Sequence, residues 1–65
     1  DEAVAVALAG LPPHYERALR AKYLDGATVA EVGKELGLGV SAAESLLARA
    51  RQAFKAAYTA AGGDR

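Results

Sequence analysis

The chain has 65 residues, 52% of them hydrophobic, and its eight basic and eight acidic side chains cancel at neutral pH. A length below roughly 70–80 residues allows one small core of a few kcal/mol, so we expect a single domain over 1–65, cut from a longer chain, with its core in 11–58. The chain has no cysteine, which excludes disulfides, and a single histidine, His14, which argues against metal sites and cofactors. It has no signal-peptide pattern and no apolar run of membrane length, which argues against membrane contact. A cytoplasmic location is expected.

Residues 2–9, EAVAVALA, allow two interpretations. The alternation of valine and alanine suits a strand, whereas the alanine content suits a helix. We favour a helix, because acidic residues at positions 1 and 2 suit its N-terminus, Gly10 suits its end, and no second strand-like segment is available for pairing. Val4 and Leu8, four residues apart, would then share one face.

The next helix is predicted to open at about Pro13 and to end at Asp25-Gly26. The residue before a proline is driven out of the helical region, whereas a proline in the first helical position loses no hydrogen bond. Glu16 and Arg20 are spaced for an i,i+4 ion pair. Apolar residues at the helical period predict its buried stripe, which contains Leu11, Tyr15, Ala18, Leu19, Tyr23 and Leu24.

A short helix is predicted to follow Thr28, because Thr28 and Glu31 have the spacing of a capping box. Val29, Val32 and Leu36 form its apolar face. A glycine at position 33 costs about 1 kcal/mol relative to alanine. We interpret Gly33 as the point where another helix crosses closely; the alternative is a tolerated weak spot.

The last helix is predicted from about Val40 to Ala60. Its start is open between Gly39 and Ser41, since Ser41 and Glu44 have the spacing of a second capping box. Leu46 lies at the edge of its apolar face, and we favour a core role over an exposed partner contact. The core-facing residues are predicted to be Val40, Ala43, Leu47, Ala50, Phe54 and Ala57. The opposite face carries Ser41, Ala42, Glu44, Ser45, Ala48, Arg49 and Gln52.

These elements predict an all-α fold, a small bundle of three to four helices that contains a helix-turn-helix. An enzyme is the weakest interpretation, because Ser41, Ser45 and His14 are scattered along helices and no glycine-rich phosphate loop follows a strand. From Ser45 to Tyr58 all the charged residues are basic, which gives a modest local footprint for nucleic acid. Basic residues toward a helix C-terminus also favour the helix dipole, so this signal alone is weak.

An ordered set of short motifs runs through the chain: Leu11-Pro12-Pro13, Tyr23-Leu24-Asp25-Gly26, Ala30-Glu31-Val32 before Leu36-Gly37, and Arg49-Ala50-Arg51. In this order and spacing the chain resembles the C-terminal conserved region, region 4, of bacterial sigma factors of the extracytoplasmic-function class. Output domains of response regulators have a similar helix arrangement. The Leu-Pro-Pro opening and the Arg-Ala-Arg ending favour a sigma factor over them.

The resemblance implies a domain, not itself an enzyme, that binds the minus-35 promoter element in the major groove and holds the flap-tip helix of the RNA polymerase β subunit in an apolar groove. Carried over to this chain, the DNA-facing positions are Ser41, Ala42, Glu44, Ser45 and Arg49. Thr28 would hold a phosphate at a helix N-terminus, and Arg51 and Lys22 would lie near the DNA backbone.

The chain departs from the commonest family pattern, in which a serine caps the recognition helix and lysine or arginine follows in its first two turns. Gly39, Ser41, Ala42 and Glu44 occupy this stretch. Base reading remains available, but phosphate anchors are sparse, so the isolated domain should bind DNA weakly.

The alternative function is a sigma-like protein-interaction module. It would bind polymerase, an anti-sigma protein or another part of its own chain through exposed Leu46, Phe54 or Tyr58, without strong DNA reading. Self-association into a dimer also stays open, since the core is small and apolar residues lie near the surface of the last helix.

Overall fold

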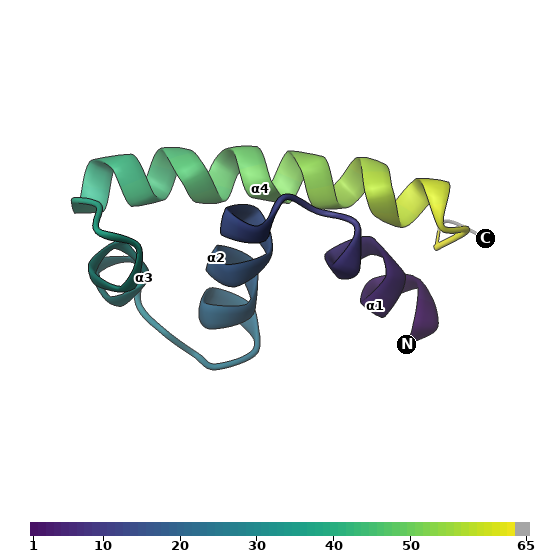
Figure 1. Ribbon diagram of the computed structural model, residues 1–65, viewed down its shortest axis with the longest axis horizontal. Helices are drawn as coiled ribbons and strands as arrows, with labels where there is room; N and C mark the ends of the chain where they lie inside the picture. Colours follow the sequence, from purple (N-terminus) through teal and green to yellow (C-terminus); the bar gives the residue numbers. More distant parts are fainter. Residues whose placement is uncertain (64–65) are drawn as a thin grey trace.

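The computed structural model describes residues 1–63, which form four α-helices and no strand: α1 (Glu2–Ala9), α2 (Pro13–Tyr23), α3 (Val29–Leu36) and α4 (Val40–Ala60). The predicted all-α class is confirmed. Helix α4 is the spine of the molecule, and the other three helices lie along one side of it (Figure 1). Helix α3 lies near the N-terminal end of α4, α2 near its middle and α1 near its C-terminal end.

Helix α1 confirms the helical interpretation of the opening segment. The Asp1 carboxylate caps it by accepting from the backbone N–H of Ala3 at 2.7 Å and of Val4 at 3.4 Å. Val4 is half-buried and Leu8 is buried, so the two share the core-facing side as predicted. The helix ends at Gly10, although with a negative φ of −86°, so this turn does not require glycine.

Helix α2 begins at Pro13 and contains the predicted ion pair, with Arg20 Nε 2.9 Å from Glu16 Oε2. Its predicted buried stripe is wrong at the C-terminal end, because Tyr23 and Leu24 are 55% and 63% exposed. Helical spacing alone assumed a neighbour along the whole length of α2, whereas the last turn of α2 borders an open groove. Ala21, which the stripe omitted, is buried instead.

Helix α3 opens with the predicted capping box, and both of its hydrogen bonds are present. The backbone N–H of Glu31 donates to Thr28 Oγ1 at 3.1 Å, and the backbone N–H of Thr28 donates to Glu31 Oε1 at 2.8 Å. The helix ends at Gly37, whose φ of +74° lies in the left-handed region that favours glycine. Of its apolar face, Val32 is fully buried, while Val29 and Leu36 are half-buried.

Helix α4 spans the predicted range, and its N-cap is Gly39, without a side-chain cap hydrogen bond. Ser41 therefore lies inside the helix, and the second capping box does not form. Val40 was predicted in the core but is 51% exposed, because no helix extends past the first turn of α4 to cover it. Leu46 is only 5% exposed, so it belongs to the core, as favoured from the sequence over an exposed contact.

The core lies where α4 meets the other helices. Leu47 and Val32 are its largest fully buried side chains, and no polar or charged residue is buried within 1–63. None of the helices in this part of the chain combines the length and hydropathy needed to cross a bilayer. The buried apolar residues are Ala7, Leu8, Leu11, Ala18, Leu19, Ala21, Val32, Ala43, Leu46, Leu47 and Ala50.

Candidate nucleic-acid interface and partner groove

The turn between α3 and α4 fixes the two helices at close range. A Cβ atom on Gly33 would lie 2.6 Å from the carbonyl oxygen of Leu38 and 3.3 Å from the Cβ of Ala43. The backbone N–H of Leu38 donates to the carbonyl of Gly33 at 2.7 Å, which closes the turn. The predicted close crossing at Gly33 is confirmed, and α3 and α4 form a helix-turn-helix with little freedom in their angle.

The predicted DNA-facing residues of α4 share an outward surface, which we call the recognition face: Ser41, Ala42, Glu44, Ser45 and Arg49. All five are exposed. Among residues 1–63, no ion pair or hydrogen bond engages the Glu44 or Arg49 side chain. These two charged groups are therefore available to an external ligand, and the side chains around them are small.

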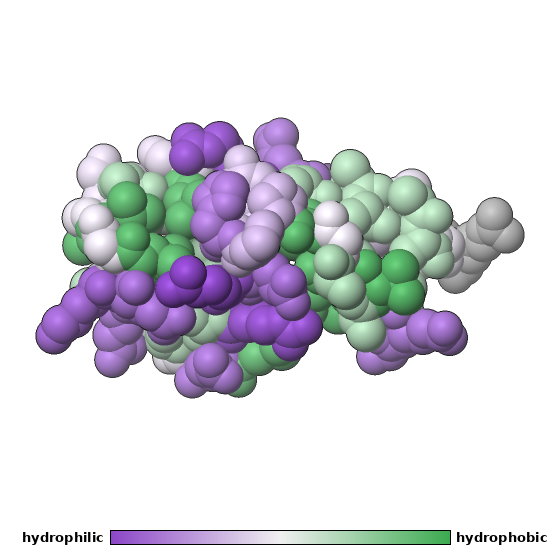
Figure 2. Space-filling view, viewed as in Figure 1, coloured by the Kyte–Doolittle hydropathy of each residue, from purple (hydrophilic) through white to green (hydrophobic). Residues whose placement is uncertain are grey.

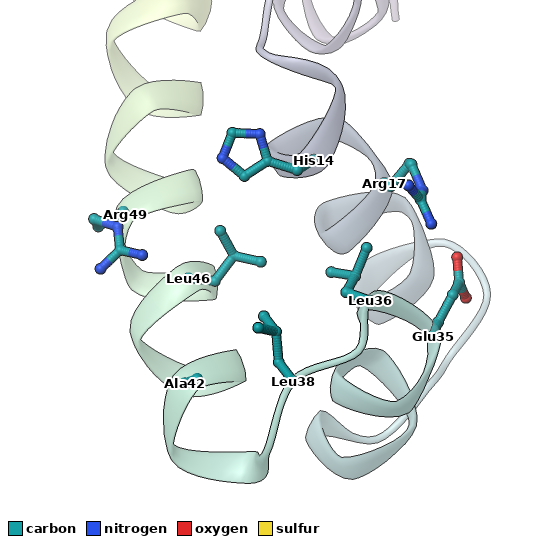
Figure 3. A pocket seen from close by; sticks show the side chains of 8 residues that line it. All are labelled: His14, Arg17, Glu35, Leu36, Leu38, Ala42, Leu46 and Arg49. Atoms are coloured by element: carbon teal, nitrogen blue, oxygen red, sulfur yellow. The ribbon is translucent and has the colours of Figure 1, made fainter.

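A hollow of about 410 Å³ borders the recognition face, between α4 and the facing ends of α2 and α3. In Figure 3 three leucines, Leu36, Leu38 and Leu46, point into this space, and Arg49 and Glu35 stand at its two edges. His14 and Arg17 approach from α2. Arg17, which was not among the predicted site residues, adds a second cation across the hollow from Arg49, at the edge where Glu35 lies.

Thr28 lies at the N-terminus of α3, where a phosphate contact was predicted. Its hydroxyl already accepts from Glu31, and the Glu31 carboxylate accepts from the Thr28 N–H. The carboxylate therefore places a negative charge where the phosphate was expected to bind. The structure thus gives Thr28 a capping role, and phosphate binding there would require Glu31 to move.

Arg51 and Lys22 do not join Arg49. Two residues apart on a helix means about 200° of rotation, so Arg49 and Arg51 point to different sides of α4. Arg51 Nη1 donates to the hydroxyl of Tyr23 at 3.1 Å, and Lys22 Nζ lies 5.4 Å from the centre of the Tyr23 ring. Arg51 and Lys22, which were predicted to lie near the DNA backbone, thus gather around Tyr23 on another side of α4 from Arg49.

A groove of about 430 Å³ opens beside Tyr23, between α1, α2 and the C-terminal half of α4. Phe54 and Tyr58 stack in it, with ring centroids 5.7 Å apart and planes inclined by 22°. Hydrophobic side chains also dominate the visible surface over α1 and the adjoining part of α4 (Figure 2). We call this the partner groove; its lining is Val4, Leu8, Leu19, Tyr23, Leu24, Arg51, Phe54, Lys55 and Tyr58.

The partner groove brings together two of the three predicted partner residues. Phe54 and Tyr58 line it, whereas Leu46 lies in the core beside the other hollow, so its role as an exposed partner contact is wrong. The contributions of Tyr23 and Leu24 were missed. Both residues continue the apolar pattern of α2 past the last turn that another helix covers. Exposed apolar residues at such a helix end could have indicated a binding surface.

Within residues 1–63 no group of three His, Asp or Glu side chains is placed to hold a metal ion. His14 packs against the neighbouring Tyr15 ring, with centroids 4.5 Å apart, and the two serines of the recognition face lie on α4. Helix α4 contributes to two surfaces on different sides, the exposed recognition face and the apolar partner groove.

Comparison with known protein families gives one match. The family described as Sigma-70, region 4 matches residues 1–54. The match includes α1, α2 and α3 and continues along α4 to Phe54. Neither the curated proteins nor the solved structures gave a match to this chain.

Proposed function

Because this chain belongs to the sigma-70 region 4 family, we propose that it is the promoter-recognition domain of an extracytoplasmic-function sigma factor. Domains of this family recognise the minus-35 promoter region and interact with RNA polymerase, and the family is not one of enzymes. In this chain, the recognition face of α4 enters the major groove of the minus-35 element. The partner groove takes the flap-tip helix of the polymerase β subunit.

The recognition face is exposed on a helix that a tight turn holds in place, and this exposure supports binding to DNA. Base edges in the major groove present hydrogen-bond donors, acceptors and the thymine methyl. The Glu44 carboxylate suits the cytosine amino group, the serine hydroxyls suit either a donor or an acceptor, and the Ala42 methyl suits thymine. Arg49 supplies a cation on the same face of α4.

The charge of the recognition face implies weak binding by the domain alone. Between Val40 and Ala48 the only charged residue is Glu44, so phosphate neutralisation depends on neighbours such as Arg49 and Arg17. Few phosphate contacts give low affinity and a shallow dependence on salt. Tethering through polymerase raises the effective concentration of the domain at the promoter and compensates for this.

The test is selection of bound sequences from a pool of random DNA duplexes at several salt concentrations. The matched chains are wild type, Glu44→Ala and Arg49→Ala, with a polymerase flap fragment added in parallel. We expect a short enriched motif whose binding weakens as salt rises. Loss of one motif position should follow Glu44→Ala, and uniformly weaker binding should follow Arg49→Ala. No enrichment with or without the flap fragment would overturn the DNA half of the proposal.

A second candidate function is a protein-interaction module that does not read DNA. The absence of lysine and arginine from the first two turns of α4 favours it. The partner groove would then bind polymerase, an anti-sigma protein or another part of the same chain. In that case Phe54→Asp should abolish partner binding, while Glu44→Ala and Arg49→Ala should leave transcription from the cognate promoter unchanged.

A further inference from the structure

We propose that the partner groove selects an amphipathic helix whose apolar face is bordered by aspartate or glutamate, and that Arg51 and Lys55 make the selection. The inference rests on the proposed function of the groove. It adds the charge pattern of the bound helix, and it assigns Arg51 to contact with the protein partner instead of the predicted contact with the DNA backbone.

The shape and lining of the groove favour an apolar helix face. The groove has a volume of about 430 Å³, and most of its lining residues are apolar or aromatic. Leu8, Leu19 and Phe54 come from three different helices, so α1, α2 and α4 together supply the apolar lining of the groove. Helices dock in such grooves through apolar side chains at positions i, i+3, i+4 and i+7. A nucleic acid strand would leave its polar groups unpaired against this lining.

Within residues 1–63, the charged residues that line the groove are all of one sign. Arg51 and Lys55 line it, and none of the aspartates or glutamates in this range does. Within residues 1–63 the ion pair formed is that of Glu16 with Arg20, so neither cation is neutralised by a carboxylate of the described chain. Unpaired cations beside an apolar surface are complementary to acidic side chains beside an apolar helix face.

Tyr23 holds one of these cations in place. Its hydroxyl accepts from Arg51 Nη1 at 3.1 Å, which uses one of the five guanidinium donors and leaves the others free for a carboxylate. Lys22 lies over the same ring. An oriented guanidinium loses less conformational freedom on binding, so its contribution to selectivity should exceed that of a free side chain.

The experiment compares two synthetic stapled helical peptides with the same leucine face, one bordered by glutamate and one by lysine. Binding to the 65-residue chain is measured by fluorescence anisotropy at low and high salt. The variants are Lys55→Glu and, as a matched charge reversal outside the groove, Lys34→Glu at an exposed position of α3. Phe54→Asp reports whether the peptides occupy the groove, and circular dichroism confirms that each variant folds.

We expect wild type and Lys34→Glu to bind the glutamate-bordered peptide more tightly, and Lys55→Glu to weaken it by about three- to tenfold. Lys55→Glu should tighten binding of the lysine-bordered peptide. Equal, salt-independent binding of both peptides that is lost in Phe54→Asp would overturn the charge rule and leave the groove as a partner site. Absence of binding by either peptide would overturn both. Displacement of the peptide by random duplex DNA would assign the two cations to nucleic acid and overturn the inference.

Discussion

The two ends of α4 present surfaces built on opposite principles. The recognition face, at the N-terminal end, carries small side chains and a single charge, the Glu44 carboxylate, before Arg49 is reached. The partner groove, at the C-terminal end, gathers stacked aromatic rings, aliphatic side chains and cations. Large aromatic anchors and arginine supply most of the binding energy at protein interfaces, whereas small polar contacts mainly discriminate between ligands. The difference suggests that affinity resides in the partner groove and sequence choice in the recognition face.

Both surfaces depend on the core beneath α4, so the largest effect is expected from a substitution there. Leu47 is 1% exposed and lies on α4 between them. Leu47→Ala should lower the free energy of unfolding by about 2–5 kcal/mol, which is comparable to the whole stability of so small a domain. Urea denaturation measures this loss, and Val40→Ala, at a position 51% exposed, should stay within about 0.5 kcal/mol. Equal effects of the two substitutions would contradict the assigned core.

Gly33→Ala separates the two surfaces, because it acts only at the recognition end. The added methyl meets the Leu38 carbonyl oxygen at 2.6 Å. We expect a loss of about 1–2 kcal/mol, since overpacking outweighs the gain in helix propensity. DNA binding should fall while peptide binding in the partner groove persists. Gly39→Ala, where a Cβ meets nothing within 4 Å, is the control; a more stable Gly33→Ala would refute the close crossing.

Thr28→Ala tests the capping role against the phosphate role. Loss of the hydroxyl that accepts from the Glu31 N–H should cost about 1 kcal/mol of stability, measured by thermal unfolding. If Thr28 only caps α3, Thr28→Ser should restore stability, and DNA affinity should follow the folded fraction. A drop in DNA affinity at full folding would restore the predicted phosphate contact.

The smallest effect is expected from a substitution at the N-cap of α4, which lies at the recognition end and away from the partner groove. Gly39 caps α4 without a side-chain hydrogen bond, so Gly39→Ser should stabilise the chain by a few tenths of a kcal/mol. Differential scanning calorimetry at matched conditions resolves such a shift. An unchanged or lowered midpoint would mean that the serine hydroxyl does not reach the free N–H groups of the first turn.

Local signals in the sequence predicted the positions of the helices and most of their ends, because caps and breakers act over a few residues. Helix α2 is the exception, since it ends at Tyr23 and not at Asp25-Gly26. The Leu11-Pro12-Pro13 boundary and the capping box of Thr28 and Glu31 have local causes, and both were confirmed in the structure. The close crossing predicted at Gly33 was confirmed by the short distances from that position to Leu38 and Ala43. The motif order also sufficed for the family, which the match over residues 1–54 confirmed.

The tertiary structure alone decided which apolar and charged residues share a surface. Tyr23, Leu24 and Val40 fit a buried period but lack a covering helix, and Leu46 at the stripe's edge is buried because neighbouring helices cover it. Arg51 does not share a face with Arg49; it donates a hydrogen bond to Tyr23, a residue 28 positions away in the sequence. Burial and pairing of this kind depend on how helices distant in sequence pack together. The apolar periodicity of one helix does not specify which other helices cover it.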